Sequence, residues 1–248
     1  FAAFRRNLTS EIKVAQFAAY AAEVSGYHHG ETSMQQTIIG MAQSFVGSNN
    51  MPLFAEGGMF GTRLMGGKDS ASPRYICTQL NPVTRQLFVK EDDNVLKQLE
   101  DDGQLIEYNH FIPTLPMVLV NGTEGIGTGW STKVPSFNPI DIATQIQQHL
   151  QQNTPYTQLT PYYNGFKGSV EQTAPQEWTF KGIIRQKSGN VVEILELPPK
   201  VWLETYKTWL TSRDFVRKFE EKSTESNIHL IVHCTKIPEH LHKAFKLK

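Results

Sequence analysis

Residues 26–30 read Gly26-Tyr27-His28-His29-Gly30, a short linker bounded by glycines between two segments of helical pattern. Before it, residues 11–25 are rich in alanine, with Ser10 at the N-cap position and Gly26 as the stop. After it, Ser33 begins a capping-box pattern, and apolar residues recur at helical spacing as far as about Phe45. Two helices joined by a short glycine-containing turn are typical of a helix-turn-helix, which presents the start of its second helix to a DNA groove.

The rest of the chain divides into glycine-rich loops and short elements. We expect residues 46–74 to be irregular, and residues 121–132 to form a second glycine loop. Asn138-Pro139 predicts a capped helix start, with the helix running to about Gln151. Alternating residues with turn signals predict strands within 165–197. The remaining expected elements are strands at 75–80, 115–120 and 228–234 and helices at 200–212 and 238–246.

Composition limits the class of protein. The 248 residues are 39% hydrophobic, which is enough for a substantial core and one or two domains. No apolar run reaches the ~18 residues that a membrane helix needs. The chain starts at Phe1 without a signal-peptide layout, so we expect a piece of a longer protein. Cys77 and Cys234 lie far apart, which favours a reduced intracellular protein over a disulfide scaffold.

The charges are balanced overall but uneven along the chain. Formal net charge is zero, so the whole-domain basic footprint of many nucleic-acid binders is missing. The basic character is local, near Arg63, Lys68 and Arg74, and a local patch can still bind phosphates. The acidic run at 91–107 has scattered spacing, which indicates a solvated face and not a metal site.

The segment with the clearest chemistry reads Gly66-Gly67-Lys68-Asp69-Ser70-Ala71-Ser72-Pro73-Arg74-Tyr75. Glycines let the backbone approach a polyanion closely. Arg74 offers two parallel hydrogen bonds to a phosphate, and Tyr75 beside it offers a phenol that can attack phosphorus. A free phenol is protonated at neutral pH, and an adjacent cation favours its charged form. Arg-Tyr pairs are common, so the pair alone is weak support for a nucleophile.

Several longer strings together resemble the DNA breakage–reunion region of eukaryotic-type (type IIA) DNA topoisomerase II. They match in order and spacing over nearly the whole chain, which is far more specific than one short motif. The strings are residues 27–31, 45–50, 60–63 and 66–75, then Val120-Asn121-Gly122-Thr123-Glu124-Gly125-Ile126-Gly127-Thr128-Gly129-Trp130-Ser131-Thr132, and more weakly 193–198 and 245–247.

The resemblance implies catalytic roles for three residues. Tyr75 matches the nucleophile that becomes linked to the 5′ end of a broken strand. Arg74 matches the neighbouring arginine that supports the reacting phosphate. His29 matches the second histidine of the Tyr-His-His-Gly-Glu string, which contacts the scissile region.

Four further residues are expected to contact DNA. Ile126 matches an isoleucine that wedges between base pairs and bends the duplex, which costs a few kcal/mol per unstacked step. His28 belongs to the same string as His29. Lys68 and Arg63 lie in the same loop system as Tyr75, and we expect phosphate contacts from both.

The resemblance also implies an architecture and an assembly. The expected fold class is α+β, with a winged-helix (helix-turn-helix) cleavage domain at residues 1–136 and a mixed α/β tower domain at 137–248. The implied enzyme is an ATP-hydrolysing type II isomerase acting on double-stranded DNA as a homodimer. Mg²⁺ would be held by the partner's Toprim domain and ATP by a separate ATPase domain, so no residue here is assigned to metal or cofactor. A cellular enzyme would be nuclear, a virus-encoded one would act in host cytoplasm, and no membrane is involved.

Other interpretations stay open. A non-catalytic DNA-bending module of the same fold would bind DNA without a covalent adduct. A metal-dependent nuclease needs clustered carboxylates, which the sequence lacks. His28 and His29 as zinc ligands lack partners at ligand spacing. A dinucleotide-binding interpretation of Gly125-Ile126-Gly127 fails because Trp130 stands where the third glycine belongs.

Overall fold

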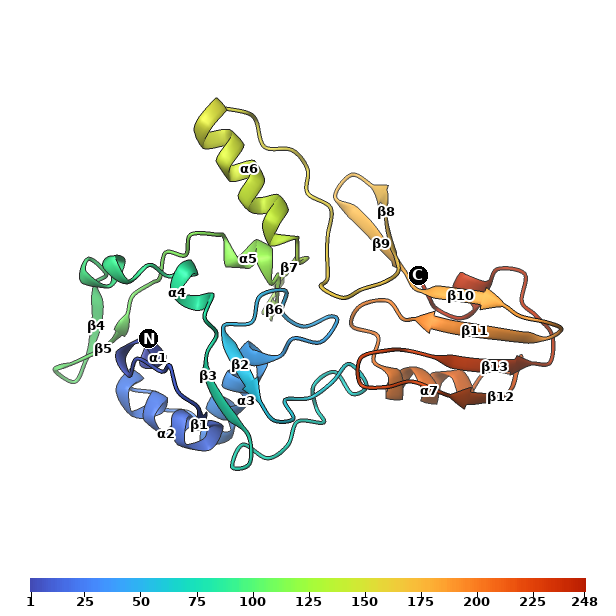
Figure 1. Cartoon of the computed structure of the whole chain (residues 1–248), viewed down its shortest axis with the longest axis horizontal. Helices are drawn as coiled ribbons and strands as arrows, with labels where there is room; N and C mark the ends of the chain where they lie inside the picture. Colours follow the sequence, from blue (N-terminus) through green and yellow to red (C-terminus); the bar gives the residue numbers. More distant parts are fainter.

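The computed structural model describes residues 1–248, and its first part is built on two packed helices. Helices α1 (Ala2–Arg5), α2 (Val14–Ser25) and α3 (Glu31–Ala42) pack with strands β1 (Ile12–Lys13), β2 (Phe54–Gly57) and β3 (Cys77–Leu80). The strands form an antiparallel sheet in the order β1-β3-β2. Thirteen buried residues, including Val14, Phe17 and Ile39, make its core. We call residues 1–80 the N-terminal body, drawn mainly in blue in Figure 1.

The helix-turn-helix is confirmed, but both helix starts were wrong. Helix α2 has Lys13 and not Ser10 at its N-cap, because residues 12–13 pair with β3 before the helix begins. It ends at Gly26, whose left-handed φ of 60° suits a residue without Cβ. Helix α3 starts two residues before Ser33, with Gly30 at its N-cap.

The middle of the chain differs most from expectation. After α4 (Thr84–Leu87), the short 3₁₀ helix η1 (Lys90–Asn94) and the hairpin β4 (Gln98–Asp101)–β5 (Gln104–Tyr108), the expected strand at 115–120 is helix α5 (Met117–Val120). The expected glycine loop is a hairpin of β6 (Thr123–Gly127) and β7 (Trp130–Val134). Gly129, with φ of 78°, provides the turn. Because neither strand buries a face, the apolar–polar alternation that marks a strand is absent.

Helix α6 (Pro139–Gln152) begins as the sequence predicts. The Asn138 side chain accepts a hydrogen bond from the Ile140 backbone N–H at 2.9 Å, and proline occupies the first turn. The helix stands out from the rest of the molecule in Figure 1 and buries only Ile142. A further hairpin, β8 (Ser169–Ala174) with β9 (Glu177–Lys181), follows it.

The last part is a second packed unit. Strands β10 (Ile183–Gln186), β11 (Val191–Glu196), β12 (Val216–Glu221) and β13 (Leu230–Cys234) form an antiparallel sheet in the order β10-β11-β13-β12. Alternate residues of β11 and β13 form a 13-residue core with α7 (Leu203–Thr211) and residues beside α8 (Leu241–Ala244). We call residues 183–248 the C-terminal body, at the right of Figure 1.

The two-part α+β architecture is therefore confirmed, while the division at residues 136/137 stays a prediction. Buried Asn50 ties chain on both sides of that point. Its Nδ2 lies within 3.1 Å of the carbonyl oxygens of Val120, Phe137 and Tyr162, and its Oδ1 accepts from the Asn164 N–H at 2.8 Å. Among all these helices, none has the length and apolar character required to cross a bilayer.

Candidate functional site

Tyr75 sits in a turn whose backbone is pinned by the start of helix α2. The first N–H groups of a helix lack partners within it. Here the Val14 N–H donates to the Ile76 carbonyl at 3.0 Å, and the Ala15 N–H donates to the Pro73 carbonyl at 3.1 Å. Ile76 is buried in the N-terminal body, whereas the side chain next to it, Tyr75, is 73% exposed. The fold therefore fixes the backbone on both sides of residues 74–75 and leaves the phenol in solvent.

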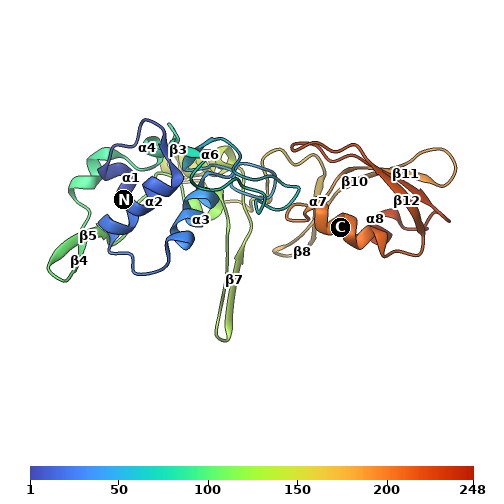
Figure 2. The same cartoon turned by 90° about the horizontal axis from the view of Figure 1, so that it is seen from below.

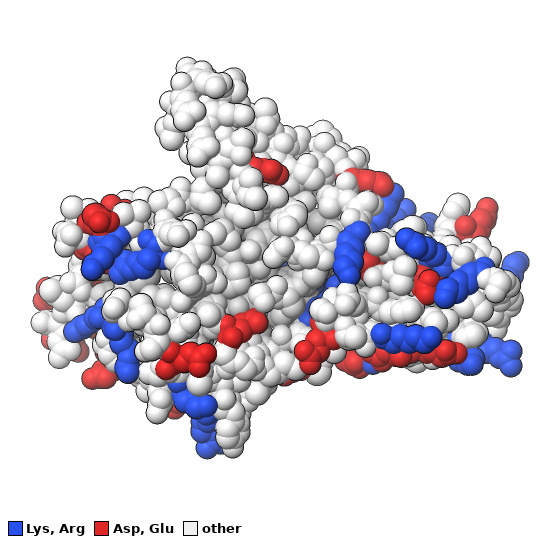
Figure 3. Space-filling model, in the orientation of Figure 1, with Lys and Arg blue, Asp and Glu red and all other residues white.

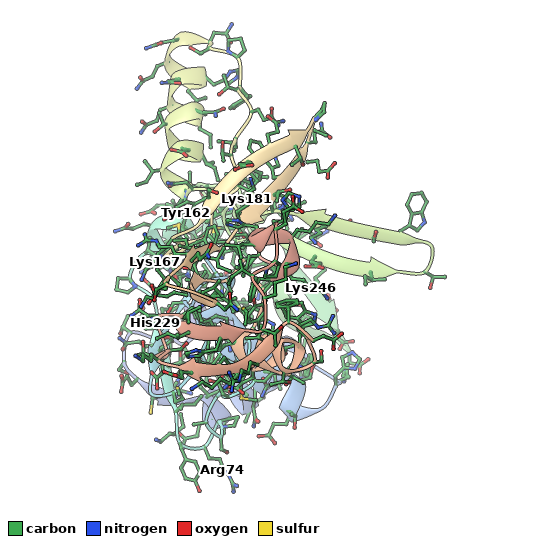
Figure 4. All side chains as sticks on the ribbon, turned by 90° about the vertical axis from the view of Figure 1, so that its right-hand side faces the viewer. Arg74, Tyr162, Lys167, Lys181, His229 and Lys246 are labelled. Carbon is green, nitrogen blue, oxygen red and sulfur yellow. The ribbon has the colours of Figure 1, made fainter.

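Cationic groups lie around this turn. The Lys13 Nζ donates to the Tyr75 carbonyl at 3.1 Å. Arg74 and Lys68 are both exposed, and neither forms an ion pair in the structure. Figure 4 shows Arg74 reaching outward at the end of the molecule opposite α6. An exposed phenol beside cations without acidic partners is a place where a phosphate can bind.

The 61–75 loop lacks regular structure but is internally crosslinked. The Thr62 N–H and hydroxyl donate to the two carboxylate oxygens of Asp69, at 2.9 and 2.6 Å. The Gln43 side-chain amide donates to the carbonyls of Phe60 and Gly67, at 2.8 and 3.3 Å. At Gly61, an added Cβ would lie 2.6 Å from the Gly67 Cα, so the loop's two limbs touch through their backbones. These contacts explain why glycines crowd this segment.

Arg63 requires a correction. Its side chain is only 4% exposed, and its Nη2 donates to Glu196 Oε1 at 2.5 Å inside the protein. Glu196, itself 1% exposed, also accepts from the backbone N–H groups of Leu197 and Lys167. A buried guanidinium with a buried partner is not free to hold DNA phosphate, because breaking the pair would leave a buried charge. The phosphate contact expected of Arg63 was therefore wrong, and the residue joins the two bodies.

The two histidines lie on the exposed linker before α3. The His28 Nε2 is 3.3 Å from an Asp101 carboxylate oxygen, and the His29 ring packs edge-on to Tyr27 with centroids 5.3 Å apart. Neither histidine hydrogen-bonds to Arg74 or Tyr75, so the structure does not join His29 to the Arg74–Tyr75 turn. No three His, Cys, Asp or Glu side chains meet in a way that could hold a metal ion, which leaves the zinc interpretation without support.

Ile126 lies on a separate structure, the β6–β7 hairpin, which Figure 2 shows projecting clear of both bodies. Ile126 is 90% exposed and Trp130 is 84% exposed. Ile126 pairs with Ser131 and Gly127 pairs with Trp130, so the two apolar side chains point to opposite faces of the hairpin. Sequence reasoning missed Trp130, although an aromatic residue beside a glycine turn is an unusual choice for solvent.

Surface charge does not gather into one basic face. In Figure 3, lysines and arginines are interspersed with acidic residues, and the projecting α6 is almost uncharged. Any polyanion contact must therefore be local, as the sequence suggests for Lys68 and Arg74.

Comparisons with known proteins agree with one another. The family model for the A-type polypeptide of DNA gyrase/topoisomerase IV matches residues 1–248. The chain is 44% identical over 254 residues to DNA topoisomerase 2 of Saccharomyces cerevisiae, and 44% identical over 263 residues to human DNA topoisomerase 2-alpha. These alignments cover the whole chain but only 18% and 17% of the relatives.

A solved structure matches equally well. The Plasmodium falciparum topoisomerase II DNA-binding, cleavage and re-ligation domain superposes with a TM-score of 0.95 at 41% identity. The match covers all of this chain and 35% of that one. The fold expected from the sequence is thereby confirmed.

Proposed function

The chain belongs to the DNA gyrase/topoisomerase IV family, on the side of its A-type polypeptide, and from that premise we propose that it breaks and rejoins DNA within a type II topoisomerase. The chain spans under a fifth of the length of the curated relatives described above. The ATP-dependent passage of one duplex through another belongs to the whole enzyme, and this chain contributes the nucleophile and the DNA-bending hairpin.

The proposed reaction is a reversible transesterification. The Tyr75 phenol oxygen attacks a backbone phosphorus in line, forming the O–P bond as the bond to the 3′ oxygen breaks. The phenol gives up its proton and the 3′ hydroxyl leaves with one. In the reverse step the 3′ hydroxyl attacks and releases the phenol. One phosphodiester replaces another, so resealing needs no ATP.

The observation that carries this proposal is the exposed phenol on a fixed backbone. Tyr75 is 73% exposed while Ile76 beside it is 1% exposed. Arg74 and Lys13 supply positive charge at the same turn, which favours both phosphate binding and the charge that develops in the transition state. A structural tyrosine would bury its ring, and this one does not.

The metal and nucleotide belong to other parts of the proposed enzyme. Mg²⁺, on the partner's Toprim domain, would stabilise the departing oxygen. ATP would be hydrolysed on a separate ATPase domain. We assign no residue of this chain to either, and the chain brings no metal-ligand cluster together. Two copies are needed, so the functional state is a homodimer on double-stranded DNA. We place it in the nucleus for a cellular source and in host cytoplasm for a viral one.

Ile126 is the proposed wedge. Its 90% exposure on a projecting hairpin leaves it free to enter a base step, and unstacking is offset by contact with bent DNA. The same hairpin favours the second candidate, a DNA-bending module without chemistry, because bending does not require Tyr75.

A denaturant-stable adduct separates the two candidates. Full-length protein, Mg²⁺ and duplex DNA should give a protein–DNA species that survives detergent, and Tyr75→Phe should abolish it while DNA affinity changes less than about two-fold. Tyr156→Phe is the matched control, because Tyr156 is also exposed, at 61%, but follows α6. Wild-type bending without any adduct would leave the bending module as the function.

A further inference from the structure

The 61–75 loop is held by both bodies, although Tyr75 belongs to the first. At Leu64 the loop reaches the C-terminal body. The Leu64 carbonyl accepts a hydrogen bond from the Glu204 N–H, at the start of α7, at 3.0 Å. The Leu64 side chain packs against the core of the C-terminal body. One limb of the loop is therefore part of the packing of a sheet more than a hundred residues further along the chain.

Trp202 makes the closest of these contacts. A Cβ added to Gly66 would lie 2.5 Å from both Cε2 and Nε1 of Trp202, so the indole lies directly against the loop backbone. The far edge of the same ring faces Gly47, where an added Cβ would lie 3.2 Å from Cη2. Phe45 packs edge-on against it with ring centroids 5.8 Å apart. The indole thus fills the junction between the turn after α3 and the loop that leads to Tyr75.

The buried Arg63–Glu196 pair fixes the same limb from below. Arg63 lies in the loop and Glu196 at the end of β11. Because Glu196 also accepts backbone hydrogen bonds from Leu197 and Lys167, its carboxylate has a fixed position. A bond to a fixed carboxylate sets the place of Arg63 and, through it, of the loop backbone.

The internal crosslinks carry this position toward Tyr75. The Thr62–Asp69 and Gln43–Gly67 hydrogen bonds join the limb held by the C-terminal body to the limb that continues to residue 75. The Ala71 N–H then donates to the Met59 carbonyl at 2.9 Å. No freely rotating stretch separates these ties from the turn at residues 72–75, where the Tyr75 N–H donates to Ser72.

We propose that Trp202 and the Arg63–Glu196 pair are positioning residues, through which the C-terminal body sets the place of Arg74 and Tyr75 against the phosphate. The inference rests on the proposed function of Tyr75. A misplacement of about 1 Å in a reacting group can cost on the order of 100-fold in rate. Loss of the indole therefore slows the chemical step, while the exposed groups that bind DNA stay in place.

The test uses Trp202→Ala and Trp202→Phe in the full-length enzyme. The matched control is Trp178→Ala, a half-buried tryptophan on β9 that does not touch the loop. DNA affinity comes from anisotropy, folding from circular dichroism, and the rates of adduct formation and resealing from quenched time courses at saturating DNA. Tyr75→Phe gives the zero of the adduct assay.

We expect Trp202→Ala to slow adduct formation by about 10- to 100-fold, with DNA affinity within about two-fold of wild type. Trp202→Phe keeps a ring against Gly66 and should recover most of the rate, and Trp178→Ala should match wild type. If Trp202→Ala does not fold, Trp202→Leu replaces it, and its rate must fall below that of Trp202→Phe.

Two results overturn the inference. One is an unchanged rate of adduct formation in folded Trp202→Ala or Trp202→Leu. The other is a rate that falls only in step with DNA affinity. Either leaves the proposed function of Tyr75 standing, because wild type still forms the adduct. Absence of the adduct in wild type would instead remove the proposed function itself.

Discussion

The 61–75 loop and the β6–β7 hairpin solve opposite problems. The loop has no regular secondary structure but is tied at Thr62, Arg63 and Gly67 to fixed partners in both bodies. The hairpin is regular, but nine of its ten strand residues are exposed. Irregular backbone is thus the more constrained of the two.

The contrast follows from what each region is proposed to do. Chemistry needs a phenol oxygen held in line with phosphorus, so its loop is fixed by packing and hydrogen bonds from several sides. A wedge needs reach into a groove, and a hairpin that buries nothing provides it. Outside its own strand pairing and its base, the hairpin is tied by the surface pair of Lys200 and Glu124, 2.9 Å apart.

The largest expected difference comes from matched glycine substitutions. Gly61 and Gly129 both have positive φ, 101° and 78°, but an added Cβ meets the Gly67 backbone at 2.6 Å in the first case and open space in the second. We expect Gly61→Ala to lower the unfolding free energy by about 3 kcal/mol or more and to reduce adduct yield at least about ten-fold. Gly129→Ala should cost about 1 kcal/mol.

Urea unfolding and the adduct assay measure the two glycine variants. Equal losses at the two positions would show that the loop is no more constrained than the hairpin, and the comparison would break.

A pair of isoleucines sharpens the comparison further. Ile76, 1% exposed beside Tyr75, should cost about 2–5 kcal/mol when changed to alanine. Ile126, 90% exposed, should change stability by less than about 0.5 kcal/mol. Ile126→Ala should instead reduce DNA bending, measured by energy transfer between dyes on the duplex ends. Normal bending by Ile126→Ala would remove the wedge from the account.

The smallest expected effect concerns the tie at the hairpin base. A hydrogen bond from Lys200, together with the attraction of Lys200 and Lys133, lowers the pKa of the exposed Glu124 carboxyl. A lowered carboxyl pKa means that the contribution exists above the ordinary value and is lost as pH falls through the lowered one. Between pH 6 and 8 the tie should therefore not vary.

Lys200→Ala tests that tie. We expect no measurable change in melting temperature, since exposed pairs contribute little, and somewhat faster amide exchange in residues 123–134. A large stability loss would show that the hairpin is held more firmly than its exposure indicates.

The sequence predicted the elements that carry local signals. Gly26 as a helix stop and Asn138 with Pro139 as a helix start were both confirmed, because each acts through its own backbone. The helix starts at Ser10 and Ser33 were wrong. The first failed because pairing of residues 12–13 with β3 took precedence over a cap, and tertiary contacts of that kind leave no local pattern.

The candidate site was predictable only in part. The glycines and the Arg74-Tyr75 pair pointed to the loop, and the structure places both side chains in solvent. Arg63 was misassigned because an arginine beside a basic loop has the same local pattern whether it faces DNA or a buried carboxylate 133 residues away. The roles of His29, His28 and Lys68 stay predictions.

The most direct measurement is identification of the residue that carries the DNA. The trapped adduct, treated with nuclease and trypsin, should give a nucleotide-modified peptide spanning residues 69–85 or 75–85, since cleavage sites follow Lys68, Arg74 and Arg85. The account predicts a 5′-phosphate on the Tyr75 oxygen and no adduct from Tyr75→Phe. A modified residue elsewhere, or an adduct that persists in Tyr75→Phe, would contradict it.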